Sequence, residues 1–410
     1  MQDEKKLNLI LERFYNRFNK YNTKVLETLG ETIKQFEGLT PSQAHKLAQE
    51  LKYSTNTEEL LNELSKLSGK SIKDIDVLLD KVAEENVEFA KQYYEIKGKK
   101  YIPYEDNIQL QRYVETIKKE TYGTFKNLSK SGNIGFTFKD SNNKTIFKPM
   151  KKVYRDLIDE AVYNVSSGVS DYQSAMRNTI NQLADSGVKI HEASNTYKSG
   201  YNRRIDSSVR QDILTGVRRV NLGIQERVGE ELGADGVEIS AHVPCADDHL
   251  EINGQQYSKK EFEEINSKLD RPVGEYNCTH FVFSIILGVS EPSYTERQLR
   301  SMRHESLSKV EYEGNKYSKY EATQVQRKLE TAIRQQKDRQ IIARASGDKD
   351  GIAKAQDKIT QLTNKYNDFS KVAGLETYKN RLTVTGYRRV STKWLFFCVK
   401  LKIIQFRYCN

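Results

Sequence analysis

The sequence contains few cysteines, prolines and tryptophans. Its 410 residues include 4 Cys, 6 Pro and 1 Trp. So few cysteines argue against a secreted domain held together by disulfides and favour a reducing compartment. Long hydrophobic runs are absent as well, because none reaches the roughly 18 residues that a membrane-spanning helix needs. The N-terminal M-Q-D-E-K-K-L lacks the basic and apolar regions of a signal peptide. We therefore expect a protein made in a cytoplasm, with no membrane partner.

A strong excess of one charge is also absent. The chain has 66 Lys and Arg against 56 Asp and Glu, which leaves a net charge of +10, and the two signs are interspersed. Such a mixed surface is usually only solvated, so charge alone does not predict nucleic-acid binding. With 37% hydrophobic and 30% charged residues, the composition favours elongated or partner-packed helices over one large core. The length allows two or three domains.

Residues 1–120 predict an N-terminal helical region. Apolar residues recur at three- and four-residue intervals from Leu7 onward, which gives a helix one apolar face. Thr40, Pro41 and Gln43 form a helix start with a capping box. We expect these helices to pack into an intramolecular bundle.

Residues 121–150 predict a β-hairpin insertion. Ile134, Phe136 and Phe138 alternate with small or polar residues, and a polar turn at 140–144 precedes a second apolar run. The hairpin is either a protruding contact loop or a small sheet that closes one end of the bundle. The sequence leaves both interpretations open.

Residues 151–233 predict long central helices. The clearest has an apolar stripe at four-residue steps, which suits packing along another helix. The arginines beside the stripe either contact phosphates or, as we favour, are solvated or salt-bridged. The stripe consists of Ile205, Val209, Ile213, Val217, Val220, Ile224, Val228 and Leu232.

Residues 234–320 predict a small α+β module that concentrates metal-binding side chains. His242-x2-Cys245 and Cys278-x-His280 can supply the four ligands of a Cys2His2 zinc site, with His249 or Asp248 as substitutes. The second pair is the weaker signal, because a C-x-H step leaves little loop to wrap a tetrahedral ion. The predicted metal ligands are therefore His242, Cys245, Cys278 and His280, with His249 as substitute, and the candidate cofactor is zinc.

A catalytic interpretation of the same residues is also open. Histidines beside Asp247 and Asp248 could transfer protons, and a cysteine with a nearby histidine could act as a nucleophile. No oxyanion loop, glycine-rich phosphate cradle or H-E-x-x-H helix accompanies them. We therefore predict no catalytic residues and favour a structural role.

An internal repeat runs through this module. Residues 251–261 match residues 311–321 at glycine, tyrosine, serine, lysine and glutamate positions. In each copy we expect a glycine turn that closes a hairpin, followed by a serine-capped helix. Between the copies, residues 281–289 form an apolar run that predicts a buried strand.

Residues 321–375 predict a helical hairpin or coiled-coil arm. Its second helix has an alternating three- and four-residue apolar seam from Ile352 to Ala373. Residues 376–410 form an atypical C-terminal tail, whose last 21 residues, from Val390, contain no acidic residue. A strand, an interfacial peptide or an altered reading frame could each produce this tail, and we assign it no function.

Four segments together resemble the phage minor capsid protein 2 family. The likeness covers residues 1–388 and is strongest over 200–375. It implies a minor head component of a tailed phage or prophage, located in the virion and assembled with portal and major capsid proteins. The family supplies no established catalytic residues, and its His/Cys pattern maps onto the five His and Cys residues named above. The segments are G-V-E-I-S-A-H-V-P-C-A-D-D-H-L-E-I-N-G-Q-Q-Y-S, F-E-E-I-N-S-K-L-D-R-P-V-G, N-C-T-H-F-V-F-S-I-I-L-G-V-S-E-P and L-E-T-A-I-R-Q-Q-K-D.

The sequence thus predicts a mainly α protein with a small α+β module, arranged as an elongated helical bundle with a C-terminal helical hairpin or coiled coil. The predicted function is that of a structural minor capsid protein, present in several copies or as an oligomer. One alternative is a metal-dependent hydrolase or nuclease-like effector carried in the virion. A second is a DNA-binding packaging factor that contacts packaged DNA, whose affinity would fall steeply with salt.

Overall fold

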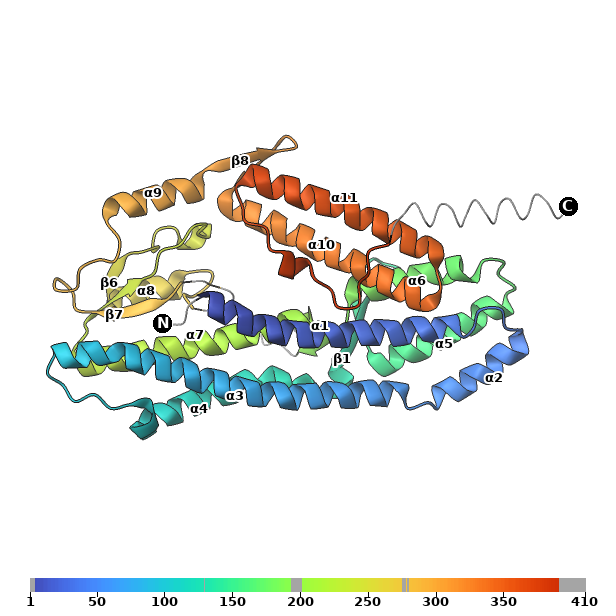
Figure 1. The fold of residues 1–410 in the computed structure, drawn as a ribbon, viewed down its shortest axis with the longest axis horizontal. Helices are drawn as coiled ribbons and strands as arrows, with labels where there is room; N and C mark the ends of the chain where they lie inside the picture. The colour runs from blue at the N-terminus through green and yellow to red at the C-terminus, as the bar shows by residue number, and fades with distance from the viewer. Residues whose placement is uncertain (1–3, 129, 193–200, 275–277, 279, 391–410) are drawn as a thin grey trace. The chain divides into compact units, whose positions relative to one another are not determined.

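The computed structural model describes residues 4–128, 130–192, 201–274, 278 and 280–390. These residues are mainly α-helical with small antiparallel sheets, which confirms the predicted fold class (Figure 1). No helix among them is long and apolar enough to cross a membrane. The apolar part of the C-terminal tail, from residue 391, lies outside the described residues, as does the segment 193–200 of the predicted central helices.

The chain forms two compact units, each assembled from three segments that are distant in the sequence. The first unit comprises residues 1–15, 68–126 and 208–325, and the second comprises 16–67, 127–207 and 326–410. The candidate metal ligands at 242–280 all belong to the first unit.

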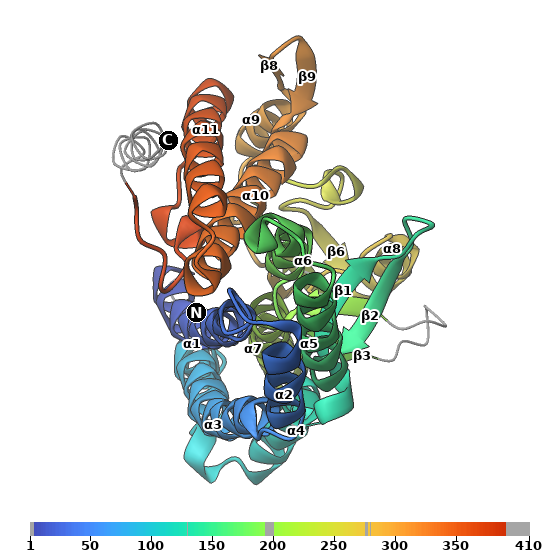
Figure 2. The same cartoon turned by 90° about the vertical axis from the view of Figure 1, so that its right-hand side faces the viewer.

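The second unit contains a four-stranded antiparallel sheet in the order β2-β1-β3-β4. Strands β1, β2 and β3 are labelled in Figure 2. Its first two strands are the predicted hairpin, paired in register from Gly135–Pro149 to Lys139–Thr145. Strand β1 also pairs with β3, so the hairpin is part of a larger sheet. The strands are β1 (Ile134–Lys139), β2 (Thr145–Pro149), β3 (Lys189–Glu192) and β4 (Tyr201–Arg204).

Strands β3 and β4 lie in a stretch that the sequence predicts as helical. Each has only four residues, and Ile190 is the one aliphatic residue among them. No alternation of apolar residues marks such strands, because they depend on their partners in the sheet: β3 pairs with β1, and β4 pairs with β3. Helices α5 (Met150–Ser166) and α6 (Tyr172–Ser186) pack against β1, and α2 (Pro41–Lys52) packs against α5. The predicted capping box of Thr40 and Gln43 begins α2.

Helices α10 (Lys319–Ser346) and α11 (Lys349–Ala373) form a helical hairpin (Figure 1). Buried polar contacts join them: Gln326 Nε2 donates to Ser370 Oγ at 2.9 Å and Gln340 Nε2 donates to Gln356 Oε1 at 3.0 Å. At their connection, Asp348 accepts a hydrogen bond from the backbone of Gly351 at 3.0 Å and so caps α11. These contacts are compatible with the predicted arm, and its supercoiling stays a prediction.

The first unit is built on close helix packing. Helices α3 (Asn56–Ile96), α4 (Ile108–Leu128) and α7 (Ile205–Leu232) supply its long elements. The predicted stripe of α7 is buried from Val209 to Ile224. Gly223 on this helix lets α4 approach, because a Cβ there would lie 2.0 Å from Tyr113 Oη. That tyrosine donates a hydrogen bond to the Arg219 carbonyl at 3.1 Å.

A three-stranded antiparallel sheet in the order β6-β5-β7 follows α7 in the first unit. Its central strand β5 (Gly236–Ile239) lies between β6 (Gln256–Ser258) and β7 (Val282–Ile285). An apolar cluster packs on the sheet, and Cys278 belongs to it. Its buried members are Val237, Ile239, Ile252, Val273, Cys278 and Val282.

The two copies of the internal repeat pair differently. In the second copy, β8 (Lys309–Tyr312) and β9 (Asn315–Ser318) form the predicted hairpin before α10. In the first copy β6 pairs with β5 instead, so the hairpin prediction is wrong there. The reason is burial: Ile252 is 3% exposed in the apolar cluster, whereas its counterpart Tyr312 is only half-buried.

Other features of the repeat are shared as predicted. Gly254 and Gly314 both have a φ of +76°, a left-handed turn conformation that favours glycine. Ser258 and Ser318 both begin a helix, each with the glutamate three positions on completing a capping box. The first of these helices is α8 (Lys259–Lys268).

Candidate metal centre

The topology of the three-stranded sheet brings the two His/Cys pairs to one place. Ile239 at the end of β5 pairs with Val282 at the start of β7. The chain that leaves β5 and the chain that enters β7 therefore meet at the same sheet end. Backbone pairing continues one step beyond the strands, where Ser240 N donates to the Phe281 carbonyl at 2.9 Å. His242 and His280 follow directly, with ring centroids 4.2 Å apart.

All five predicted ligands gather at this sheet end. Short turns carry the first part of the chain into a 3₁₀ turn, η3 (Asp247–His249), which returns His249 to the cluster. Two groups of three ligand atoms lie within 4.8 Å of one another: His242, Cys245 and His280 form one, and His249, Cys278 and His280 form the other. His280 belongs to both groups, so the residues do not form one symmetrical set of four.

The second group is the tighter one. His249 Nδ1 lies 3.3 Å from His280 Nδ1, and Cys278 Sγ lies 3.4 Å from His280 Nδ1 and 3.7 Å from His249 Nδ1. In the first group, Cys245 Sγ lies 3.8 Å from His280 Nε2.

Four of the five side chains are almost completely buried. Cys245, His249, Cys278 and His280 are 1–3% exposed, whereas His242 is half-buried. Both cysteines are free thiols. A pocket between α7 and the sheet reaches His280, with Arg218, Leu222 and Phe281 among its lining residues.

The chain matches one family model, phage minor capsid protein 2, over residues 3–371. It belongs to that family. The match covers most of both units and stops before the atypical tail. No curated protein and no solved structure matches the chain.

The two thiols of this minor capsid protein are in different electrostatic states. Burial raises the pKa of Cys245 to about 12, and nearby Cys278 adds to the increase. Burial also acts to raise the pKa of Cys278, but hydrogen bonds with the His249 ring and from the backbone of Gly274 and His280 outweigh it, and the pKa is lowered. Cys278 is therefore the thiol that its surroundings favour as a thiolate, the form that binds metals.

The histidines differ in the same way. Burial lowers the pKa of His280 to about 3, helped by His242 and His249, and it also lowers the pKa of His242. Burial acts to lower the pKa of His249 as well, but contacts with Cys278 and the Arg271 carbonyl reverse the shift, and the pKa is raised. His280 and His242 are thus neutral imidazoles at neutral pH, as metal ligation requires.

Three neighbouring residues were not singled out from the sequence. Asn253 holds His242, because its Oδ1 accepts from His242 N at 3.0 Å and its Nδ2 donates to the His242 carbonyl at 3.3 Å. The Arg271 carbonyl lies 2.7 Å from His249 Nε2. Ser306 Oγ accepts a hydrogen bond from Cys245 N at 3.3 Å. One signal was available for Asn253: it is an asparagine where the second copy of the repeat has Glu313.

Asp248, a predicted substitute ligand, has a different role. The Arg271 guanidinium binds both of its carboxylate oxygens, at 3.2 and 2.7 Å. Burial acts to raise the pKa of Asp248, but the hydrogen bond from Arg271 and the nearby His249 outweigh it, and the pKa is lowered. The aspartate therefore connects η3 to the segment that follows α8.

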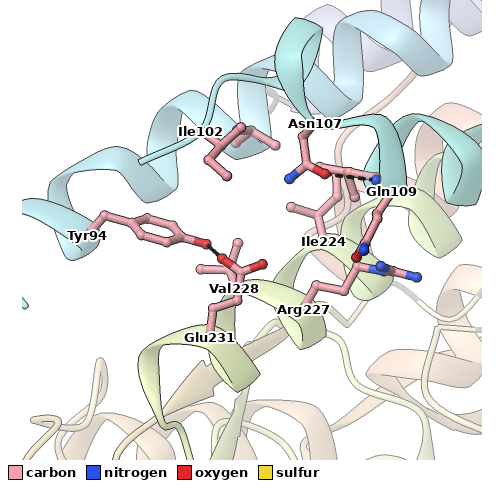
Figure 3. Close-up of a pocket in the computed structure, with 10 residues that line it drawn as sticks. Tyr94, Ile102, Asn107, Gln109, Ile224, Arg227, Val228 and Glu231 are labelled. Carbon is pink, nitrogen blue, oxygen red and sulfur yellow. Dashed lines mark hydrogen bonds between the residues drawn. The ribbon is translucent and has the colours of Figure 1, made fainter. Parts of the chain in front are cut away.

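A second pocket of the first unit lies among α3, α4 and α7, away from the predicted ligands (Figure 3). Tyr94 on α3 donates a hydrogen bond to Glu231 on α7 across it. Asn107 Oδ1 accepts from Leu110 N at 3.0 Å and so caps the start of α4. These contacts brace the three helices, and no residue of the pocket was predicted as a functional site.

Proposed function

We propose that this protein is a minor structural component of a phage or prophage head, incorporated in several copies and assembled with portal and major capsid proteins. The observation that supports the proposal is the family match, which extends over residues 3–371 and so takes in segments of both units. A match of that extent concerns the body of the protein rather than one shared motif. Its location in the virion follows from the same proposal.

Exposed apolar side chains give this proposal a testable surface. Large apolar residues are exposed where α3 ends and α4 begins, including Ile96 at 77% and Ile108 at 63%. Phe89 and Tyr93 on the same stretch of α3 are also exposed and form an edge-to-face pair 5.9 Å apart. Ile102 lines the pocket of Figure 3. Exposed large apolar residues are typical of protein–protein contacts, so we propose that this corner, defined as residues 89–108, contacts another head protein.

The primary test is the location of the protein. Purified virions or procapsids, separated from free protein by sedimentation, should contain it at a fixed ratio to the major capsid protein. Its absence from both particles would contradict the proposal. Mass spectrometry of crosslinked particles should then recover crosslinks from this protein to portal or major capsid protein.

A pair of substitutions tests the corner. Ile96→Glu with Ile108→Glu should lower incorporation into particles by about tenfold or more, as expected for apolar residues at the centre of an interface. Val77→Glu is the matched control, because Val77 is 69% exposed on the same helix but lies away from the corner. Unchanged incorporation of the double variant, with an unchanged thermal midpoint, would remove this surface from the proposal.

The enzymatic alternative lacks a favourable observation. A metal-dependent hydrolase needs a general base near its metal-bound water, but Asp248, the carboxylate beside His249, is engaged by Arg271. The alternative predicts DNA cleavage that His242→Ala abolishes, and a nuclease assay on both proteins tests it.

A further inference from the structure

We propose that His249, Cys278 and His280 bind one zinc-class metal ion, with both histidines ligating through Nδ1. This set is smaller than the spacing of the sequence suggests. It replaces His242 by His249 and leaves Cys245 outside the ligand set. The inference does not depend on the capsid role, because it rests only on contacts within the first unit.

The distances between the three ligand atoms match those between three ligands of a tetrahedral zinc ion. Zinc–nitrogen bonds of about 2.0–2.1 Å and zinc–sulfur bonds of about 2.3 Å at tetrahedral angles place ligand atoms about 3.3–3.6 Å apart. The two Nδ1 atoms are 3.3 Å apart, and Cys278 Sγ lies 3.4 Å from His280 Nδ1 and 3.7 Å from His249 Nδ1. The three atoms therefore already have the spacing that a single ion requires.

Hydrogen bonds at the other ring nitrogens fix where the imidazole protons are. His249 Nε2 lies 2.7 Å from the Arg271 carbonyl, which can only accept, so this nitrogen carries the proton. His280 Nε2 lies 3.0 Å from Asn253 Oδ1. The asparagine is oriented by the backbone of His242, which donates to Oδ1 and accepts from Nδ2, so its oxygen faces the ring. His280 Nε2 therefore also carries a proton.

Both Nδ1 atoms consequently present lone pairs to each other. While both rings are neutral, each carries its single proton on Nε2, so neither Nδ1 can donate to the other across 3.3 Å. The thiol of Cys278, whose Sγ lies 3.4 Å from His280 Nδ1 and 3.7 Å from His249 Nδ1, has at most one proton to donate to the two nitrogens. Such a buried group of acceptors is unfavourable unless a cation lies among them.

The same pattern is typical of metal-ligating histidines. A ligating imidazole usually donates its second N–H to a carbonyl or carboxylate, which fixes the ring and its tautomer. Arg271 and Asn253 provide these acceptors for His249 and His280. Arg271 is itself held by its pair with Asp248, at 2.7 Å.

The other triplet does not have this arrangement. To ligate with His242 and Cys245, His280 would have to present a lone pair at Nε2, but that nitrogen faces the Asn253 oxygen. The Cys245 thiol donates to the Ala246 carbonyl at 3.5 Å. His242 alone in this triplet has the pattern of a ligand, because its Nδ1 lies 3.1 Å from the Pro244 carbonyl and a lone pair therefore remains on Nε2; the triplet fails at His280 and Cys245.

Two imidazoles and one thiolate form a ligand set intermediate between hard and soft, which suits zinc and the related divalent ions. The pocket that reaches His280 gives an ion or a fourth ligand access to the site. A bound ion would join η3 to the chain that enters β7, and so would close the end of the three-stranded sheet.

The test uses the full-length protein and two matched cysteine variants. Purified wild type should contain about one zinc per chain by elemental analysis, and Cys278→Ser or His249→Gln should lower this to about a tenth or less. Cys245→Ser is the matched control, because Cys245 is equally buried in the same cluster. It should retain the metal, as should His242→Gln.

Cobalt spectroscopy of the wild type provides a readout that does not depend on the folding of a variant, and Cys245→Ser is compared with it only where its circular dichroism matches that of wild type. Cobalt(II) titrated into chelator-treated wild type should produce a thiolate-to-cobalt charge-transfer band at one equivalent, and Cys245→Ser should retain that band. Wild type without zinc and without the cobalt band would overturn the proposal. Loss of the band in Cys245→Ser would overturn the ligand set in favour of one that includes Cys245.

Discussion

Each of the two units contains a buried cluster of hydrogen-bond acceptors. The clusters differ in whether a positively charged side chain lies among those acceptors. In the second unit, Asp206 and Asp338 are 3% and 0% exposed, and Arg204 lies between them. Arg204 Nη1 is 3.0 Å from Asp338 Oδ2, and its Nε is 3.4 Å from Asp206 Oδ1. Asn22 Nδ2 donates to the other oxygen of Asp338 at 3.3 Å. The protein thus supplies the cation for this cluster.

The acceptors in the cluster of the first unit are buried to a similar extent, but no described residue places a positively charged group among the proposed ligand atoms. His249, Cys278 and His280 direct two nitrogens and a sulfur at one another, and the neighbouring guanidinium of Arg271 is bound to Asp248. Buried charges need a partner, whether a side chain or a metal. The comparison shows that burial alone does not identify a binding site. The diagnostic feature is a group of buried acceptors that face one another with no side-chain cation among them.

Removing the cation from the second unit should produce the largest effect. Arg204→Met leaves two buried carboxylates without their shared partner, and breaking a buried ion pair in this way costs about 3–5 kcal/mol. Urea unfolding followed by circular dichroism measures the loss. Arg204→Lys keeps the charge and should lose less. Equal stability of Arg204→Met and wild type would mean that this cluster does not depend on its arginine.

Removing the cation from the first unit should produce the next largest effect. A metal that binds only the folded state stabilises by about 2.7–4.1 kcal/mol when its free concentration is 100 to 1,000 times Kd. Chelator should therefore lower the unfolding midpoint of wild type, and added zinc should restore it. Cys278→Ser should have the low midpoint with or without chelator. A midpoint of wild type that is insensitive to chelator would contradict the proposed site.

Much of the fold could be predicted because local sequence patterns determine where its helices begin and which of their faces are buried. Capping boxes at Thr40, Ser258 and Ser318 occur as predicted, and the stripe of α7 is buried as far as Ile224. Strands β3 and β4 were not predicted, since β3 pairs with β1 and β4 with β3, and four-residue segments formed by such pairing show no periodicity.

For the candidate site, spacing predicted which residues meet but not how they are oriented. His242, Cys245, Cys278 and His280 do gather, because β5 and β7 are antiparallel neighbours. The distinction between the two triplets depends on which ring nitrogen carries a proton. That is decided by the carbonyl of Arg271 and the amide of Asn253, and no pattern of ligand types in the sequence encodes such contacts.

Asn253→Ala should produce a smaller effect that sharpens the comparison. It removes the acceptor at His280 Nε2 while leaving the three proposed ligands in place. Loss of such a second hydrogen bond typically lowers metal affinity about 10- to 100-fold. Competition with a chromophoric chelator measures the affinity of the variant against that of wild type. Ser306→Ala is the matched control, because Ser306 contacts the backbone of Cys245, outside the proposed set. An unchanged affinity of Asn253→Ala would mean that the amide does not fix the tautomer.

The smallest effect concerns a carboxylate that, unlike the first cluster, has a hydroxyl group as hydrogen-bond donor and, unlike the second cluster, has no cation in contact with it among the described residues. Thr179 Oγ1 on α6 lies 2.7 and 2.8 Å from the two carboxylate oxygens of Glu160 on α5. Burial raises the pKa of Glu160, partly opposed by the hydrogen bond from Thr179 and by Lys148. Because the folded-state pKa lies above the unfolded value, the charged form destabilises the fold at neutral pH, and this penalty disappears as pH falls below the unfolded pKa. Glu160→Gln keeps the Thr179 contact without the charge, so it should stabilise at neutral pH by less than about 1 kcal/mol, since solvent screens a half-buried charge.

Unfolding midpoints of Glu160→Gln and wild type should converge as the pH falls towards about 4, where the carboxyl group becomes neutral in both states. A difference that is independent of pH would assign the effect to packing instead. Convergence would show that a buried acceptor with hydrogen bonds but only a distant cation still carries a charge penalty. The two Nδ1 atoms of the first cluster, which share at most the one thiol proton of Cys278, should then gain more from a bound cation than Glu160 gains from the loss of its charge.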